Sequence, residues 1–229
     1  MAGMDGGHSA AVDDYVKAVY KLVESEGTAT TSRIALRLGL SASSVSGMAR
    51  KLADLGLVEH RPYAGLTLTE AGRRHALSML RRHRLIETFL VQELGYGWDE
   101  VQDEAEVLEH YVSDTFLARI DAKLGHPRVD PHGDPIPDVE GRTVEQEACV
   151  LSLLEPGTTG LLVRVDEEDP AVLRHLKERG FGLGTEVRMR GRHPFGGSFI
   201  VSLGGDTDEH LLGPELAAAM WVAGGDQVR

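Results

Sequence analysis

The sequence has very little cysteine, no long apolar run and no overall excess of basic residues. Cys149 is the only cysteine in 229 residues, which excludes an intramolecular disulfide and a multi-cysteine zinc site. No apolar run reaches the roughly 18 residues that a membrane-spanning helix needs. The glycine-rich start, Met1–Ser9, lacks the basic and apolar regions of a secretory signal. We therefore expect a cytoplasmic protein that does not contact a membrane.

Acidic residues exceed basic ones, but the excess is unevenly distributed. The formal net charge is −12, from 24 basic and 36 acidic residues, and this sum alone argues against binding to nucleic acid. Residues 30–84, however, hold ten basic and three acidic residues, whereas residues 85–229 hold 12 basic and 28 acidic ones. The split indicates one part that meets polyanions and another that is suited to binding cations, although chance variation of surface charge would also produce it.

The hydrophobic pattern predicts a helical first half and a strand-rich second half. Helices are expected over residues 12–26, 33–38, 41–55, 70–93 and 99–124, the last with a possible joint at Ser113. Two short strands are expected at 57–61 and 66–68. After a loop rich in proline and glycine, 125–141, strands are expected at 149–154, 159–165, 186–190 and 199–203, with a helix at 170–179. The C-terminal pattern is typical of a small β-barrel.

Residues 31–55 have the layout of a helix-turn-helix. The small residues Ala35 and Gly39 let two short helices cross closely, and the second helix begins with hydroxyl side chains that can enter a major groove. The strand pair that follows resembles a wing. An αα-hairpin in an ordinary helical domain is the alternative, but the spacing, the wing and the local charge of +7 together favour DNA binding. The candidate DNA contacts are Arg33, Ser41, Ser43, Ser44, Ser46, Arg50, Arg61 and Tyr63.

Carboxylates and imidazoles recur at helical spacing. They are Asp13 and Asp14 on the first predicted helix, His83 and Glu87 on the fourth, and Glu106, Glu109 and His110 on the fifth, with Gln102 one turn earlier. Carboxylate oxygen and imidazole nitrogen suit manganese, iron(II) or zinc. A solvated acidic helix face is the alternative for any one pair, but the two clusters together favour a metal site.

The pattern does not match the familiar metalloenzyme motifs. A zinc protease needs two histidines around its acid in one short motif, and a ferritin-like di-iron centre needs paired Glu-x-x-His motifs. A metal-dependent hydrolase with an appended helix-turn-helix remains the alternative from another functional class. The sequence shows no activated nucleophile and no histidine-rich open site, so we expect a protein that is not an enzyme.

Taken in order, these segments resemble the metal-dependent transcriptional repressors of the diphtheria toxin repressor and manganese transport regulator family. The pieces that carry the resemblance are DDYVKAVYKL, RPYAGLTLTEAG, RRHRLIETFL, DEAEVLEHYVSD and HPRVDPHGDPIP, and it extends from Val12 to Val222. It implies a mainly α protein: a winged helix-turn-helix (1–74), a helical dimerisation and metal-binding domain with a proline-rich linker (75–144) and an SH3-like, FeoA-like β-barrel (145–229). It also implies a homodimer that binds an inverted-repeat operator in double-stranded DNA when loaded with metal.

The resemblance further implies which residues hold the metal. Asp14, Glu106, Glu109 and His110 correspond to the primary regulatory site of the family. Manganese-type members have acidic residues at the first two of these positions, whereas iron-type members have methionine and cysteine. We therefore expect Mn(II), with an Fe(II)-responsive repressor as the alternative.

A second metal site in each subunit is implied at His83 and Glu87. Gln102 stands where iron-type members have histidine, and Lys17 stands where short manganese-type members have a glutamate ligand, which an ammonium group cannot replace. Longer members complete this site from the C-terminal domain. Glu168 and Asp169 fall near those ligands, and we expect them to contribute.

Overall fold

The computed structural model describes residues 8–61, 65–144, 146–166, 169–205 and 208–224. The chain forms two compact units, one of residues 1–83 with 137–142 and one of residues 84–136 with 143–229. In the described residues no helix is both long and apolar enough to cross a membrane. Each unit is described separately below, and one long helix, α4, begins in the first and ends in the second.

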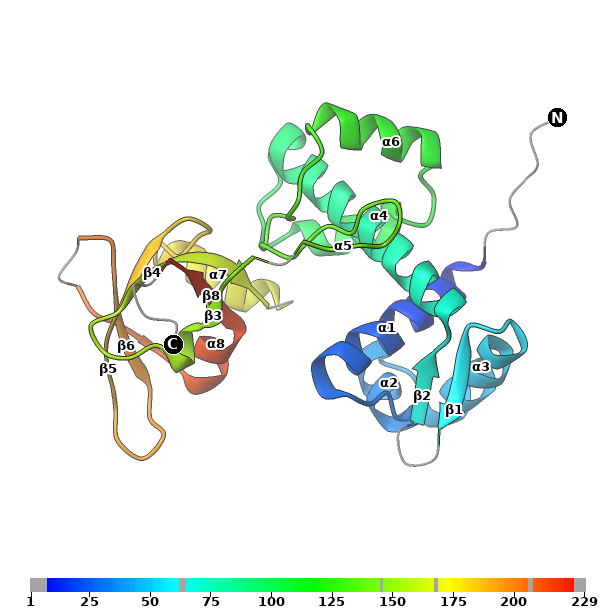
Figure 1. The fold of residues 1–229 in the computed structure, drawn as a ribbon, viewed down its shortest axis with the longest axis horizontal. Helices are drawn as coiled ribbons and strands as arrows, with labels where there is room; N and C mark the ends of the chain where they lie inside the picture. Colours follow the sequence, from blue (N-terminus) through cyan, green and yellow to red (C-terminus); the bar gives the residue numbers. More distant parts are fainter. Residues whose placement is uncertain (1–7, 62–64, 145, 167–168, 206–207, 225–229) are drawn as a thin grey trace. The chain divides into compact units, whose positions relative to one another are not determined.

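The first unit is a small helical domain with a two-stranded wing (Figure 1). Its elements are α1 (Ala10–Glu26), α2 (Thr31–Leu38), α3 (Ala42–Asp54), β1 (Val58–Arg61), β2 (Gly65–Leu68) and the start of α4 (Glu70–Leu94). Hydroxyl side chains begin three of these helices. Thr30, Ser41 and Thr69 each accept a hydrogen bond from a backbone N–H in the first turn of α2, α3 and α4.

The core of the first unit comes from the apolar faces of α1, α2 and α3. Val16, Val19, Ile34, Val45 and Leu52 are all fully buried in one cluster. The two strands pair antiparallel from Val58 opposite Leu68 to Arg61 opposite Gly65. This arrangement confirms the helix-turn-helix and the wing. The tip of the wing, including the predicted contact Tyr63, lies outside the described residues.

The helical part of the second unit contains the end of α4, α5 (Val101–Leu108) and α6 (Asp114–Lys123). Ser113 separates α5 from α6, because its side chain accepts a hydrogen bond from the N–H of Phe116 and so begins a new helix. The expected joint at this residue is therefore confirmed. Leu85, Val101 and Ala105 are fully buried in the core that these helices share.

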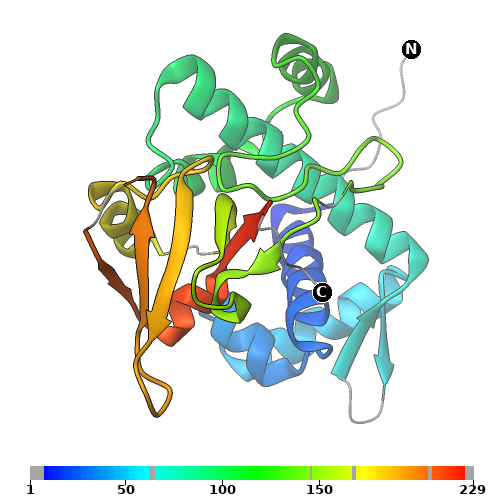
Figure 2. The same ribbon diagram turned by 60° about the vertical axis from the view of Figure 1, so that its left-hand side comes forward.

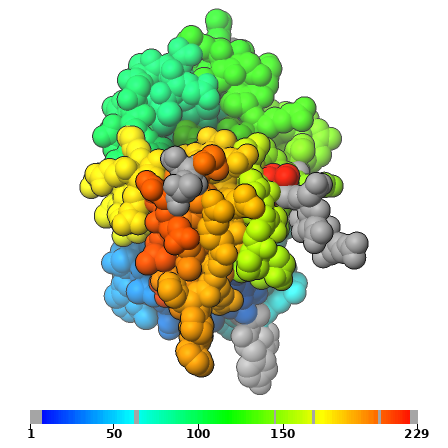
Figure 3. Space-filling model, turned by 90° about the vertical axis from the view of Figure 1, so that its left-hand side faces the viewer, coloured from blue at the N-terminus to red at the C-terminus, as the bar shows by residue number. Residues whose placement is uncertain are grey.

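The C-terminal part of the second unit is a six-stranded antiparallel sheet with two short helices (Figure 2). Its elements are β3 (Cys149–Val150), the 3-10 turn η1 (Leu151–Leu153), β4 (Thr159–Val165), α7 (Pro170–Glu178), β5 (Glu186–Arg192), β6 (Phe199–Leu203), β7 (His210–Leu212), α8 (Pro214–Ala219) and β8 (Met220–Ala223). The strand order is β3-β8-β4-β5-β6-β7. The loop between β5 and β6 projects from the surface (Figure 3).

Two expectations for this part are wrong. The sheet of the described residues is not a closed barrel, because its edge strands β3 and β7 are only two and three residues long and do not pair with each other. It remains consistent with an SH3-like fold. The strand expected at 149–154 ends at Val150, where the chain turns into η1. The sequence pattern also did not indicate β7, α8 or β8, which are too short to show a clear periodicity.

Candidate metal centre and DNA-binding surface

One side of α3 carries the exposed polar residues expected of a recognition helix. Ser43, Ser46 and Arg50 are exposed and recur at spacings of three and four residues, so they lie along one side of the helix. Arg61, at the end of β1, is also exposed. Hydroxyl and guanidinium groups in this pattern can contact base edges and phosphates.

Several of the predicted DNA contacts also have partners inside the protein. The Ser41 side chain accepts a hydrogen bond from the Ser44 N–H at 3.2 Å and so caps α3. Arg33 forms a two-pronged ion pair with Glu26, in which its Nε donates to Oε2 at 2.8 Å. This pair lowers the pKa of the Glu26 carboxyl. Arg33 and Ser41 therefore have a structural role besides any contact with DNA. Ser43 is exposed, and its hydroxyl lies 2.9 Å from that of Ser41, whereas Arg50 faces solvent.

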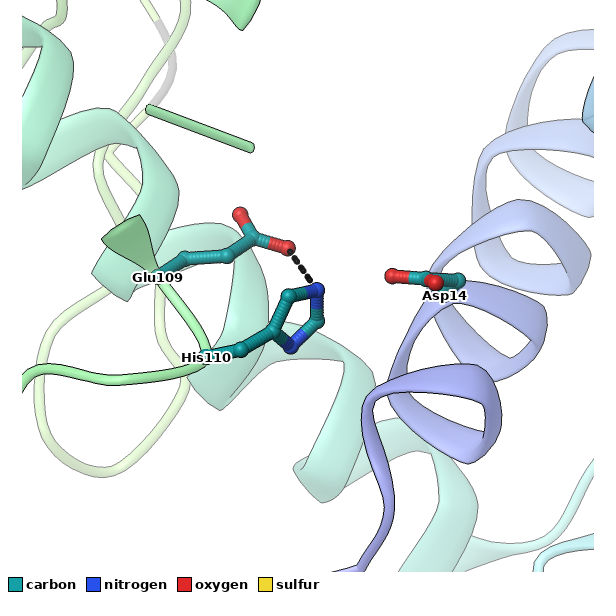
Figure 4. Close-up of side chains that lie close together, drawn as sticks. All are labelled: Asp14, Glu109 and His110. Carbon is teal, nitrogen blue, oxygen red and sulfur yellow. Dashed lines mark ion pairs between the residues drawn. The ribbon is translucent and has the colours of Figure 1, made fainter. Parts of the chain in front are cut away.

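The end of α5 brings two of the predicted primary ligands together. Glu109 is completely buried, and its Oε1 lies 3.6 Å from Nε2 of the partly buried His110 (Figure 4). Glu106, also partly buried, is one turn earlier on α5. Asp14 comes from α1 of the first unit, where it is partly buried. A buried carboxylate next to an imidazole is a donor pair that suits a divalent cation.

A second cluster of donors lies entirely within the second unit. Glu87 of α4 meets Asp130 and His132 of the loop that follows α6, and one ligand atom from each residue lies within 4.8 Å of the others. All three residues are buried, and His132 Nδ1 is 4.0 Å from Glu87 Oε1. The sequence predicts Glu87 as a ligand but not Asp130 or His132. The prolines of their segment, HPRVDPHGDPIP, predict a linker, although its Asp-x-His spacing is a signal for ligands.

The second cluster holds more negative charge than its surroundings neutralise. Burial, together with the neighbouring carboxylates of Asp134 and Glu87, raises the pKa of Asp130 to about 7. Arg84 opposes this rise, with its Nε 3.5 Å from Asp130 and its Nη2 3.7 Å from Asp134. Buried carboxylates with an imidazole and no thiolate fit a divalent cation such as Mn(II) or Fe(II).

The remaining residues predicted for the second site are not all in this cluster. His83 is buried on α4, one turn before Glu87, and Gln102 is partly buried on α5. Asp169 begins α7, where its Oδ1 accepts a hydrogen bond from the N–H of Ala171 at 2.8 Å. Glu168 lies outside the described residues.

Comparison with known proteins assigns three successive segments to known domains. The profile "Iron dependent repressor, N-terminal DNA binding domain" matches residues 9–66, and "Iron dependent repressor, metal binding and dimerisation domain" matches residues 69–138. The FeoA domain profile matches residues 149–224. The segment that matches the metal-binding profile thus includes Glu106, Glu109 and His110 as well as the cluster of Glu87, Asp130 and His132.

Known proteins are similar to this chain over different shares of its length. The solved structure of a manganese-dependent transcriptional repressor in complex with manganese is 47% identical, with a TM-score of 0.85, over 92% of this chain and 98% of that one. The diphtheria toxin repressor of Corynebacterium efficiens is 31% identical over 76% of this chain and 80% of its own length. The iron-dependent repressor IdeR of Mycobacterium tuberculosis is 37% identical, over 54% of each chain. This chain therefore belongs to the iron-dependent repressor family of metal-dependent transcriptional repressors.

Proposed function

We propose that this chain is a Mn(II)-dependent repressor that binds an inverted-repeat operator as a homodimer. The observation that carries the choice of metal is the donor set. Asp14, Glu106, Glu109 and His110 offer only oxygen and imidazole nitrogen, and the single cysteine, Cys149, lies on β3 of the sheet. Such hard donors suit manganese, which must be selected by ligand type because it binds weakly to most sites. Fe(II) is the alternative within the same family.

The proposed primary site joins the DNA-binding domain to the dimerisation domain. Glu106, Glu109 and His110 come from one end of α5, and Asp14 comes from α1, the helix that packs on the helix-turn-helix. Ligation by both groups would fix the DNA-binding domains at one separation, as two successive major grooves require. Coupling of about 1.4 kcal/mol is needed for each tenfold gain in operator affinity.

We propose a second metal site at Glu87, Asp130 and His132, in place of one built on His83 and Glu87 alone. The support is the burial of all three donors and the raised pKa of Asp130, since a bound cation would offset the repulsion between carboxylates. Glu168, expected as a further ligand, stays a prediction. This arrangement gives two metal ions per subunit.

The proposed dimer contact is the apolar surface of the helical domain in the second unit. Val107, Tyr111 and Phe116 are 58%, 81% and 48% exposed, although they belong to a small cluster of helices with a well-packed core. Exposed apolar side chains at this density indicate an interface. We expect Tyr111→Glu to shift the sedimentation coefficient of the metal-loaded protein from that of a dimer toward that of a monomer. A dimer of unchanged strength would rule out this surface.

Since a repressor dimer acts on chromosomal DNA, the proposal places the protein in the cytoplasm.

Titration of operator binding with Mn(II), and with Fe(II) under anaerobic conditions, tests the choice of metal. We expect Mn(II) to give half-maximal DNA binding at a concentration that agrees with its binding to the primary site. Binding that is unchanged at saturating EDTA would refute metal dependence, and a response to Fe(II) alone would replace the manganese assignment with the iron one.

Two variants test the assignment of the primary ligands. Asp14→Ala and Glu106→Ala should each shift the Mn(II) dependence of operator binding to at least tenfold higher concentration. Glu104→Ala is the matched control, since Glu104 is an exposed carboxylate on the same helix. A normal Mn(II) response in the Asp14 and Glu106 variants would show that the ligands are wrongly assigned.

A further inference from the structure

We infer that the FeoA domain positions a ligand of the second metal site without having to supply one itself. It holds the imidazole of His132 in the orientation that directs Nδ1 toward Glu87. Trp98 and Arg164 are then positioning residues of this site, and the inference rests on the metal site proposed at Glu87, Asp130 and His132. The contacts that carry it all lie within the second unit.

The hydrogen bond of His132 fixes which ring nitrogen can bind a metal. Its Nε2 lies 2.8 Å from the backbone carbonyl oxygen of Trp98. A carbonyl can only accept, so Nε2 must carry the proton, and Nδ1 of the neutral ring has a free lone pair. Nδ1 faces Glu87 Oε1 at 4.0 Å. A cation between these two acceptors could bind both of them. The arrangement matches metal sites in which the histidine ligand donates its other ring N–H to a backbone carbonyl.

The segment that supplies this carbonyl is held by the FeoA domain. The Trp98 side chain packs against the hydrophobic core of the sheet, and its ring lies nearly parallel to that of His132 with the centroids 6.0 Å apart. The next residue, Asp99, is buried and accepts hydrogen bonds from Lys177 Nζ at 3.0 Å and Arg174 Nε at 3.3 Å, both on α7. Displacement of α7 would therefore displace the acceptor of His132.

The loop that carries His132 is held by the same domain from the other side. The N–H of Val165, at the end of β4, donates to the His132 carbonyl at 2.9 Å. On the same strand, Arg164 Nε lies 2.8 Å from Asp134 Oδ1. Asp130 Oδ1 accepts hydrogen bonds from the N–H groups of His132 and Asp134, so one side-chain oxygen also shapes the loop. The sheet thus contacts both the ligand loop and the segment that sets its tautomer.

The inference predicts a selective loss of metal affinity. In the full-length protein, Arg164→Gln removes the ion pair to Asp134, and Lys177→Met removes a donor to Asp99 on the other side. In a calorimetric titration, each variant should bind the second equivalent of Mn(II) about tenfold or more weakly than the wild type. The affinity for the first equivalent should stay unchanged. Arg188→Gln is the matched control, because Arg188 is an exposed arginine on the neighbouring strand β5 and should leave both equivalents unchanged.

The ring nitrogens of His132 provide a second measurement that a purely structural role would not affect. In metal-free protein, the 15N chemical shifts, assigned with a His132→Gln variant, should show a proton on Nε2 and none on Nδ1. Arg164→Gln should weaken that preference. A proton on Nδ1 alone in the wild-type protein would overturn the inference.

A further variant separates failure of the inference from failure of the proposed site. Glu87→Gln should abolish the second equivalent of Mn(II), because it removes a ligand. If Glu87→Gln still binds two equivalents, the site itself is wrong. If Glu87→Gln loses one equivalent but Arg164→Gln and Lys177→Met both behave like Arg188→Gln, the site stands and the positioning role of the FeoA domain is wrong.

Discussion

Replacement of Gly133 by alanine should show how closely the loop of residues 130–134, which carries the ligands Asp130 and His132, packs against β4. The loss of stability should exceed the cost of the backbone conformation alone. Gly133 has φ +88°, and a Cβ at this position would lie 2.0 Å from the Val163 carbonyl oxygen and 2.7 Å from Arg164 Cα. Gly125 has a similar φ of +71° but open space around its Cβ position. Gly125→Ala is therefore a matched control that carries the cost of the backbone conformation alone.

The geometry gives an expected size for the two effects. A positive φ costs an alanine roughly 1–2 kcal/mol, and this should be the whole effect at Gly125. At Gly133 the loop or β4 must also retreat by about 1 Å, and overpacking of this kind costs roughly 1–3 kcal/mol more. We thus expect Gly133→Ala to lower the free energy of unfolding by about 2–5 kcal/mol, and by about 1–3 kcal/mol more than Gly125→Ala.

Urea denaturation followed by tryptophan fluorescence measures this difference. Trp98 and Trp221 are the two tryptophans of the chain, and both lie in the second unit, so the signal reports on the unit that contains the mutations. Gly133→Ala should also weaken the second equivalent of Mn(II), whereas Gly125→Ala should not. Equal destabilisation by the two variants would refute the reasoning, since it would show that the loop does not rest against β4.

Three other predictions concern single contacts. His75→Ala removes the 2.7 Å hydrogen bond to the buried Asp13 and should lower the free energy of unfolding in urea by about 1–3 kcal/mol. The double variant Asp13→Asn/His75→Ala should be little less stable than His75→Ala alone, because both changes remove the same bond. In operator-binding titrations at several salt concentrations, Arg50→Ala should reduce the affinity and lower the slope of log affinity against log salt concentration by about one. Part of the effect of Arg33→Ala should instead be a loss of stability, because Arg33 is paired with Glu26. The bond from Lys177 lowers the pKa of Asp99, so its stabilisation should be complete above about pH 5 and disappear as the pH falls through the lowered pKa. The difference in unfolding free energy between wild type and Asp99→Asn should shrink accordingly below about pH 4, and a constant difference would contradict this pH dependence.

Local features of the sequence were sufficient to predict the helices of the first half and the wing. Thr30, Ser41 and Thr69 cap helices through bonds to nearby backbone N–H groups, so their effect does not depend on distant parts of the chain. Ser113 begins α6 for the same reason. The short strands β7 and β8 depend on pairing with β6 and β4, and that pairing is invisible in a single segment.

The sequence by itself determined the helical framework and the uneven distribution of charge, and it predicted the donors Glu106, Glu109 and His110 at the end of α5, because they recur at helical spacing. Only the tertiary structure decided that Asp130 and His132 meet Glu87. They lie more than forty residues from it, and their loop is held in place by Arg84 and β4 as well as by its own hydrogen bonds to Asp130. A proline-rich segment without periodicity carries no signal of where it packs, so its ligands become visible only once it is folded against its neighbours.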